Sequence, residues 1–330
     1  MICLVLTLWS AQSSRQSLRG LLGLRFDEDR ASRSRPLPPP RALRARELLR
    51  FKSAPGLSKC HAGARGGGQH RRVAFGIGRV AIYSVNFGVY SNTSTSAAMR
   101  NRAFAAARCD VYDLYEVTEL PMMDAVVAYS GGVVNAAKLS KYLVAEALLE
   151  VYDAVVYMDA DAAIRAAVPG CPELPDFVSP LLEQHPSAAL FLDTFGAPQQ
   201  QSSLLDQLNT GVFVIRATTW AKKFIREVVS HSRDLPMEPP VRISGAQVSF
   251  ATRPGYKGTF DQRIIVDLLS EMPFAEVDIN VHFTRPTLSS LVAWAAVHPE
   301  AVILHAVGTG GWQNMSETIR SLLAKHPVPC

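Results

Sequence analysis

Cysteine is scarce in this sequence, with five residues in a chain of 330. The five form no C-x-x-C pair and no cluster with metal-ligand spacing, so they give no sign of a cysteine metal centre. A chain of this length does not need a disulfide framework, and the odd count leaves the cellular compartment open. The cysteines are Cys3, Cys60, Cys109, Cys171 and Cys330.

Long apolar runs are also missing at the N-terminus, where residues 2–9 form a run of only eight. A segment this short cannot cross a bilayer, because a spanning helix needs about 20 apolar residues. Small residues follow the run, as they follow the apolar part of a signal peptide, but no charged segment precedes it. Residues 2–9 are therefore expected to be a degenerate signal or anchor.

The main part of the chain has no excess of positive charge, although the formal net charge of the whole is +5. Residues 1–72 hold fifteen basic and four acidic side chains, which leaves nineteen basic and twenty-five acidic side chains in residues 73–330. A nucleic-acid-binding domain needs a basic face of its own. The distribution of charge therefore argues against nucleic acid as a partner.

Arginine, serine, proline and glycine dominate the segment that follows the apolar run. This composition cannot bury enough apolar surface to offset chain entropy, so residues 1–72 are expected to be a disordered basic leader. A secretory stem, an organelle transit segment and a wrongly predicted first exon all stay open as its origin. The first would place the protein in the Golgi or secretory pathway, as a type II membrane protein if residues 2–9 anchor it. Sequons at Asn92 and Asn314 would carry glycans only in a secretory lumen.

Strand-like and helix-like apolar patterns alternate from residue 73 onwards. The alternation predicts one α/β domain over residues 73–330 with a mostly parallel sheet, whose ligands bind at the carboxyl ends of the strands. The expected strands cover residues 80–87, 111–117, 153–158, 188–192, 212–215 and 301–307. The expected helices cover residues 97–108, 136–151, 218–231, 261–271 and 316–325, with Thr218 as a cap.

Two carboxylates directly follow one of these strands. Asp159 and Asp161 are two residues apart, and in an extended segment such residues project to the same side, about 7 Å apart along the chain. Carboxylates that face a crevice together repel each other unless a cation or proton joins them. Mg²⁺ and Mn²⁺ commonly bind one or two carboxylates together with substrate phosphates. The pair therefore predicts a divalent-cation site, and the chemistry that fits is departure of a nucleotide diphosphate.

Five segments in this order resemble the donor-binding core of retaining GT-A glycosyltransferases. The order and spacing are similar to the α-galactosyl- and α-xylosyltransferases of the yeast mannan and plant xyloglucan type, and glycogenin-like enzymes share the layout. The resemblance extends over residues 78–325 and implies the GT-A (Rossmann-like) fold. The segments are KYL (141–143), YDAVVYMDADAAI (152–164), LNTGVFVIR (208–216), FDQ (260–262) and LHAVG (304–308).

The resemblance implies a cation site with three protein ligands. Asp161 would be the main ligand, and Asp159 would contact both the cation and the ribose or sugar of the donor. His305, at the end of a predicted strand, would be the third ligand. Manganese or magnesium is the implied cofactor.

Contacts to the donor are implied as well. Lys141 would contact the donor, while Tyr83 and Asn86 would lie near the nucleotide base. Arg100 or Arg102 would assist them. Together, these residues would hold a UDP- or GDP-sugar against the cation site.

The remaining implied residues surround the sugar. Asn209 and Gly211 would meet the donor or acceptor sugar, and glycine would let the backbone approach it closely. Gln262 would face the reacting side of the sugar, and Asp261 would bind hydroxyls and also serve as a helix N-cap. Glycogenin-like relatives have a lysine soon after the position of Gly308; here a glycine-rich loop takes its place, and its N–H groups are expected to cradle phosphate.

The implied reaction moves a hexosyl or pentosyl unit to a hydroxyl of a glycan or glycoprotein acceptor, with retention at the anomeric carbon. A dehydrogenase is disfavoured, because the pattern GIGRVA at residues 76–81 runs into a strand where a helix is required. A D-x-D phosphatase needs Thr or Val where this chain has Ala163, and a later Gly-Asp-x-x-x-Asp that is missing. A non-catalytic nucleotide-sugar-binding relative stays open.

Overall fold

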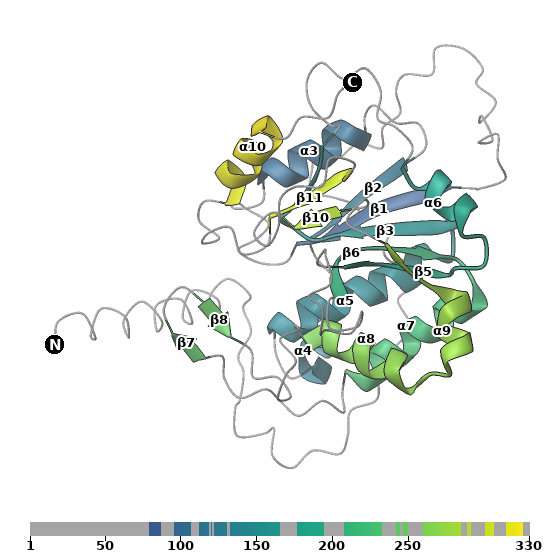
Figure 1. Cartoon of the computed structure of the whole chain (residues 1–330). Helices are drawn as coiled ribbons and strands as arrows, with labels where there is room; N and C mark the ends of the chain where they lie inside the picture. The colour runs from purple at the N-terminus through teal and green to yellow at the C-terminus, as the bar shows by residue number, and fades with distance from the viewer. Residues whose placement is uncertain are drawn as a thin grey trace.

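The structure is a computed structural model (Figure 1). It describes residues 79–86, 96–106, 112–118, 120, 122–130, 133–165, 177–194, 208–232, 242–244, 247–249, 260–284, 289–291, 301–306 and 315–325. The expected leader, the asparagines of both sequons and Gly308 lie outside these residues. Within the described part of the chain, no helix combines the length and the apolar character needed to cross a membrane.

A six-stranded sheet forms the centre of the protein, in the order β2-β1-β3-β6-β5-β9. Every strand points the same way except β6, which runs antiparallel to both of its neighbours. The expected α/β class with a mostly parallel central sheet is therefore confirmed. The strands are β1 (Val80–Val85), β2 (Tyr112–Val117), β3 (Ala154–Met158), β5 (Leu190–Thr194), β6 (Leu208–Arg216) and β9 (Val281–Thr284).

The central strands are mostly apolar because both faces of the sheet are covered. Along β1, Ala81 and Tyr83 enter one hydrophobic core, while Val80 and Ile82 enter another on the opposite face. All residues of β1 and β3 are buried. A strand that is covered on both faces has a nearly continuous apolar sequence instead of an alternating one.

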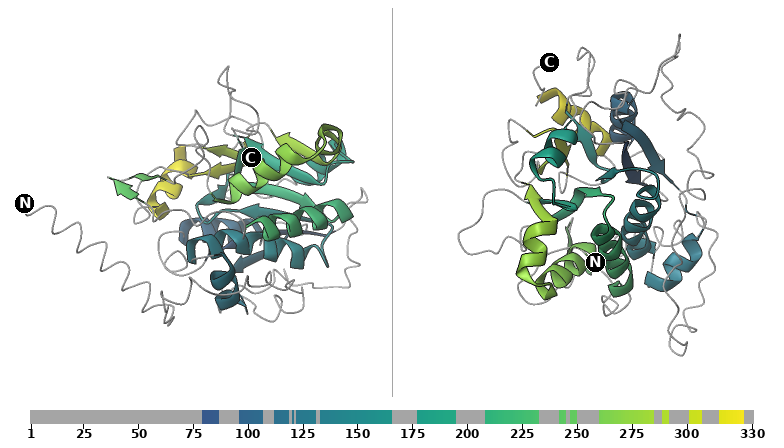
Figure 2. Two further views of the ribbon diagram at one scale, coloured as in Figure 1. Left: turned by 90° about the horizontal axis from the view of Figure 1, so that it is seen from below. Right: turned by 90° about the vertical axis from the view of Figure 1, so that its right-hand side faces the viewer.

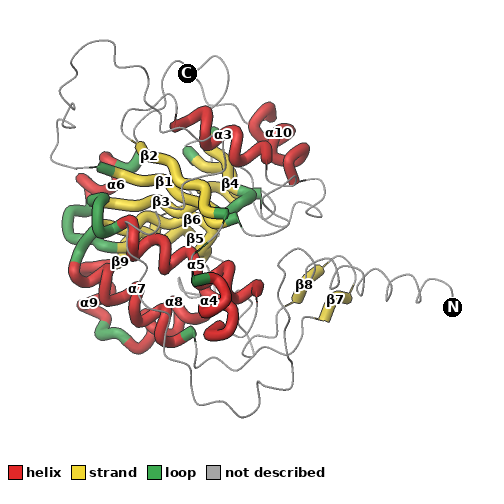
Figure 3. Tube along the Cα trace, turned by 180° about the vertical axis from the view of Figure 1, so that it is seen from behind, coloured by secondary structure: helices red, strands yellow, loops and turns green. Residues whose placement is uncertain are grey.

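A layer of helices covers one face of the sheet, below it in Figure 1. Figures 2 and 3 show the same layer from below and from behind. The predicted cap is confirmed, because the side chain of Thr218 accepts a hydrogen bond from the amide of Ala221 at 3.0 Å. The helices of this layer are α4 (Met123–Ser130), α5 (Val133–Leu148), α7 (Thr219–His231) and α8 (Phe260–Glu271), followed by α9 (Phe274–Asn280).

A smaller three-stranded sheet, in the order β10-β11-β4, lies on the other side with two helices. Its strands β11 and β4 pair antiparallel, with His305 opposite Ala162. Because β4 follows β3 closely in the chain, this pairing brings His305 to the end of β3. These elements are β4 (Ala162–Ile164), β10 (Ser289–Leu291), β11 (Ile303–His305), α3 (Ser96–Ala106) and α10 (Met315–Lys325).

Three short elements complete the described fold: α6 (Ser179–Gln184) and the hairpin-like pair β7 (Arg242–Ser244) and β8 (Gln247–Ser249). The sequence patterns did not predict them, nor α4, α9, β4, β9 or β10. Several expected boundaries were wrong by a few residues: β5 and β6 begin at Leu190 and Leu208 instead of residues 188 and 212, and α5 covers Val133–Leu148 instead of residues 136–151. The last strand is limited to Ile303–His305, and α8 begins at Phe260, so Asp261 lies in the first turn of the helix instead of at its N-cap.

Candidate metal centre

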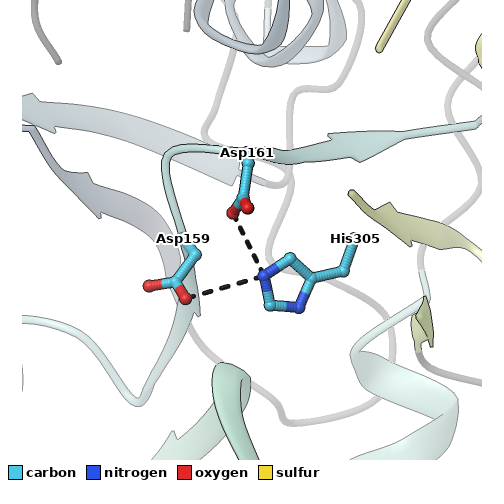
Figure 4. Close-up of side chains that lie close together, drawn as sticks. All are labelled: Asp159, Asp161 and His305. Carbon is cyan, nitrogen blue, oxygen red and sulfur yellow. Dashed lines mark hydrogen bonds and ion pairs between the residues drawn. The ribbon is translucent and has the colours of Figure 1, made fainter. Parts of the chain in front are cut away.

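The three predicted metal ligands meet at the carboxyl end of β3 (Figure 4). One ligand atom from each of Asp159, Asp161 and His305 lies within 4.8 Å of the others. Nε2 of His305 is 3.1 Å from Oδ1 of Asp161 and 3.6 Å from Oδ2 of Asp159. In the part of the chain that the structure describes, no other group of three His, Cys, Asp or Glu side chains is close enough to hold an ion.

Backbone hydrogen bonds hold the turn of residues 159–162, which follows β3, between the two sheets. The amide of Asp159 donates to the carbonyl of Gly211 at 2.7 Å, which ties the turn to β6. The amide of Ala306 donates to the carbonyl of Asp161 at 3.1 Å, which ties it to β11. The turn itself closes with a bond of 3.0 Å from the amide of Ala162 to the carbonyl of Asp159. Segments far apart in the sequence thus share one small region.

The three ligands differ in their exposure to solvent. The side chains of His305 and Asp161 are 1% and 9% exposed, whereas that of Asp159 is 37% exposed. Asp159 therefore forms the open side of the group, where a ligand from solution could approach. The phenol of Tyr157 donates to Oδ1 of Asp159 at 2.5 Å and leaves Oδ2 facing His305. Burial raises the pKa of Tyr157, as does Asp159, so the phenol stays a hydrogen-bond donor at neutral pH.

The charges of the group stabilise one another. Burial lowers the pKa of His305, but Asp161 and Asp159 outweigh it and raise the pKa to about 10. Burial raises the pKa of Asp161, but the imidazolium of His305 and the charge of Arg102 bring it below its usual value. In the absence of a metal, a proton on Nε2 of His305 therefore lies between the two carboxylates. A cation would replace this proton, because metals bind the neutral imidazole.

The donor set fits a divalent cation. The two carboxylates suit Mn²⁺ or Mg²⁺, which keep further positions for water or phosphate oxygens, and the imidazole favours a transition metal such as Mn²⁺ over Mg²⁺. Nε2 of His305 faces the carboxylates, while Nδ1 is buried and has no hydrogen-bond partner within the described residues. Nε2 is therefore the atom that would bind the cation.

Gly211 packs directly against this group. A Cβ atom added there would lie 2.0 Å from Cε1 of His305 and 2.6 Å from Oδ2 of Asp159. Real carbon contacts lie near 3.5–4.0 Å, so no side chain fits at this position without moving the ligands. The glycine of the Asn209–Thr210–Gly211 segment thus makes room for the metal ligands themselves.

A second cluster, formed by Lys141, Asp261 and Thr210, begins one residue before Gly211 on β6. Nζ of Lys141 forms a buried ion pair with Asp261 and donates to the carbonyl of Thr210 at 2.8 Å. The hydroxyl of Thr210 also donates to Asp261, at 2.5 Å. Burial raises the pKa of Asp261, but Lys141 and Lys138 outweigh it and lower the pKa overall, so Asp261 is ionised at neutral pH. Residues 209–211 of β6 therefore join the metal centre to this cluster.

The side chain of Lys141 is surrounded by protein. Nζ lies 5.0 Å from the ring centre of Tyr157, 5.4 Å from that of Tyr142 and 5.7 Å from that of Phe213. The lysine side chain is 4% exposed. In this arrangement Lys141 orients Asp261 and β6, and its contact with a donor stays a prediction.

The other predicted contact residues lie in different surroundings. Tyr83 is buried and donates to the carbonyl of Lys141 at 2.8 Å, and the buried amide of Asn86 donates to Glu116 at 2.7 Å. Arg100 is exposed on α3. Their roles at the nucleotide base stay predictions.

Two of the residues predicted to surround the sugar meet at the start of β6, with Asn209 in the strand and Gln262 on α8. The side-chain amide of Gln262 donates to the carbonyl of Leu208 at 3.2 Å. The side-chain oxygen of Asn209 accepts from the amide of Gly211 at 2.7 Å. Both side chains are buried, and both lie next to the segment that adjoins the metal centre.

Sequence reasoning missed two polar residues of this edge of the sheet. Tyr157 lies two residues before Asp159, and the period of a strand places both on one side, which was a usable signal. Asp193 is fully buried at the carboxyl end of β5, where the hydroxyl of Thr284 donates to it at 3.3 Å. A carboxylate following the apolar strand residues 190–192 was the available signal for Asp193.

No model of a protein family matches this sequence. No curated protein matches it either. Several solved structures of glycosyltransferases have a similar arrangement of the chain.

One of them is a glycosyltransferase involved in the glycosylation of the major capsid of PBCV-1, with 14% identity and a TM-score of 0.45 over 73% of this chain and 99% of that one. Mouse xyloside xylosyltransferase 1 is 9% identical, with a TM-score of 0.38 over 71% of this chain and 99% of that one. The galactosyltransferase LgtC, solved with donor and acceptor sugar analogues, is 13% identical, with a TM-score of 0.38 over 76% and 97%. At these values the functional conclusion has to rest on the site.

Proposed function

We propose that this protein is a GT-A glycosyltransferase that depends on a divalent metal and uses a nucleotide-diphosphate sugar as its donor. The observation that carries the proposal is the meeting of Asp159, Asp161 and His305 at the carboxyl end of β3. This is the edge of an α/β sheet where ligands bind. The resemblance of the surrounding motifs to retaining GT-A enzymes supports the same conclusion.

The residues of the chain would divide the work between binding and reaction. A bound cation would neutralise the charge that develops on the leaving diphosphate. Asp159, on the open side, would lie nearest to the phosphates and the ribose. Asn209 and Gln262 would face the sugar, and the ionised Asp261 would orient hydroxyl groups of the sugar or acceptor. We propose transfer of a hexosyl or pentosyl unit from a UDP- or GDP-sugar to a glycan or glycoprotein hydroxyl, with retention.

A thermal-shift screen of UDP- and GDP-sugars, with and without Mn²⁺, tests the proposal directly. A suitable donor should raise the unfolding temperature only when Mn²⁺ is present, and it should be hydrolysed slowly without an acceptor. Asp161→Ala should abolish both effects. Asp153→Ala is the matched control, because Asp153 is an exposed aspartate just before β3. Full metal-dependent turnover in the Asp161 variant would refute the assigned site.

A non-catalytic nucleotide-sugar-binding protein is the second reading, and the same screen separates the two. Such a protein would show the Mn²⁺-dependent shift without any hydrolysis. A location in the secretory pathway is a separate proposal that rests on the basic leader. Glycan occupancy at Asn92 or Asn314 in the protein made by its native cells would support that location.

A further inference from the structure

Arg102 on α3, which the resemblance offered as an alternative to Arg100 near the nucleotide base, is a buried charged side chain to which the proposed reaction gives no role. Its guanidinium forms a fork-like ion pair with Glu116 of β2, with Nε 2.7 Å from Oε1 and a second nitrogen 3.2 Å from Oε2. Both side chains are at most 1% exposed. The amide of Asn86 donates to the same carboxylate at 2.7 Å, which fixes the acidic partner at the end of β1.

The remaining nitrogen of the guanidinium points to the turn that carries the metal ligands. It donates to the carbonyl of Ala162 at 2.6 Å and to that of Asp159 at 3.3 Å. These two carbonyls lie on either side of Asp161 in the chain. The guanidinium therefore spans the turn from one end to the other.

Asn101, the preceding residue of α3, holds the strand that leaves the turn. Its side-chain amide donates to the carbonyl of Ile164 at 2.9 Å, and its side-chain oxygen accepts from the amide of Ile164 at 2.7 Å. Asn101 thus pairs with the backbone of β4 much as a neighbouring strand would. Together, Asn101 and Arg102 bind the backbone of residues 159–164 at four points.

A buried ion pair is an expensive way to attach a helix to a sheet. Charges lose their hydration inside a protein, and apolar replacements of a buried pair are often equally stable or more so. A guanidinium offers five donors in a rigid plane, so it can bind a carboxylate and backbone carbonyls at once, which no apolar side chain can do. The charged pair of Arg102 and Glu116 is therefore better explained by its role in holding the turn of residues 159–162 than by a contribution to the free energy of unfolding.

We propose that Asn101 and Arg102 are positioning residues, which form a clamp that fixes the turn of residues 159–162 and so aims both aspartates at His305 and the cation. The inference rests on the proposed metal-dependent function. It assigns no contact between the clamp and the metal or the substrate.

Mn²⁺ affinity, measured by electron paramagnetic resonance of the free ion, tests the clamp without any need for a substrate. The main comparison is between Glu116→Gln and Arg102→Met/Glu116→Gln, which differ only at Arg102. The double variant removes both charges, so it leaves no unpaired buried ion and little net change of charge near the site. The control for the chemical change is Arg226→Met/Glu146→Gln, which alters a 2.7 Å pair between α7 and α5 whose arginine side chain is 70% exposed.

Positioning predicts that the double variant binds Mn²⁺ about 10- to 100-fold more weakly, as is usual when support of metal ligands is lost. Glu116→Gln keeps the guanidinium on the turn and should stay within about threefold of the wild type. The Arg226 control should bind as the wild type does. Circular dichroism and the unfolding temperature show whether each variant is folded. If the double variant does not fold, Asn101→Ala replaces it, since it removes the neutral hydrogen bonds to Ile164 and changes no charge.

The possible results have distinct meanings. A lower unfolding temperature with unchanged Mn²⁺ affinity in the double variant would make the pair merely structural and overturn the clamp. Tighter Mn²⁺ binding by the double variant would also overturn the clamp. It would mean that the positive charge of Arg102 affects the cation only by Coulomb repulsion, which weakens cation binding and disappears with the charge. If the wild-type protein itself binds no Mn²⁺, the proposed function and the clamp both fail.

Discussion

Replacing Gly211 by alanine should damage the metal centre more than its small size suggests. The new Cβ would lie 2.0 Å from Cε1 and 2.8 Å from Nε2 of His305, and 2.6 Å from Oδ2 of Asp159. Gly211 lies inside β6, at a point where the pairing with β5 is irregular, but its amide and carbonyl are both hydrogen-bonded, which resists movement of the strand. The imidazole has to move instead.

The size of the effect follows from these distances. An ordinary carbon contact of about 3.5 Å requires the imidazole ring to shift by about 1.5 Å. Metal–ligand distances tolerate only about 0.2 Å, so a shift of this size removes His305 from the coordination sphere. We expect Mn²⁺ affinity to fall at least about 100-fold, which corresponds to ~2.7 kcal/mol.

A double-mutant cycle measured by isothermal titration with Mn²⁺ checks the cause. His305→Ala alone should weaken binding. Adding Gly211→Ala to it should cost less than Gly211→Ala costs alone, because the clash with the imidazole has gone and only the clash with Asp159 stays. If the losses of Mn²⁺ affinity from the two substitutions simply add, the new methyl group does not act through His305. Wild-type Mn²⁺ affinity in the single Gly211 variant would refute the reasoning outright.

Mn²⁺ affinity should rise with pH, because the ion has to displace the proton of His305, whose pKa burial lowers but Asp161 and Asp159 raise to about 10. Calorimetry should show about a tenfold increase per pH unit between about pH 6.5 and 8.5, and a flat profile would contradict proton displacement. Lys141→Met should destabilise the protein by ~3–5 kcal/mol in urea unfolding, because Asp261 loses its buried partner. Lys141→Met/Asp261→Asn should recover part of this loss, and equal losses in both variants would argue against the ion pair.

Much of the sheet could be predicted from the sequence because its central strands are covered on both faces. Residues 80–85 and 154–158 form short runs that are apolar except for Ser84 and rich in valine, isoleucine and tyrosine, and such runs are typical of buried strands. Elements such as β4 and β10 are only three residues long, so they carry no usable period. Their existence depends on pairing with β11, which is a tertiary contact and leaves no local pattern.

The metal ligands were predictable to different degrees for a similar reason. Asp159 and Asp161 are neighbours on one strand end, so local geometry is enough to place them together. His305 lies 144 residues beyond Asp161, and only the resemblance to a known family pointed to it. The resemblance pointed to Arg102 only as an alternative to Arg100 near the nucleotide base, and nothing pointed to its pairing with Glu116. A strand glutamate looks like an ordinary solvent-exposed residue until the packing of α3 is known.

The metal centre takes its ligands from both sheets, since Asp159 follows β3 of the large sheet and His305 ends β11 of the small one. An ion held there would cross-link two layers that otherwise meet through side-chain packing and a few backbone bonds. Removal of the cation should therefore loosen the contact between the two sheets as well as empty the site. Hydrogen exchange of β11 and its partner β4 should quicken when a chelator strips the ion, even where no sugar nucleotide is present.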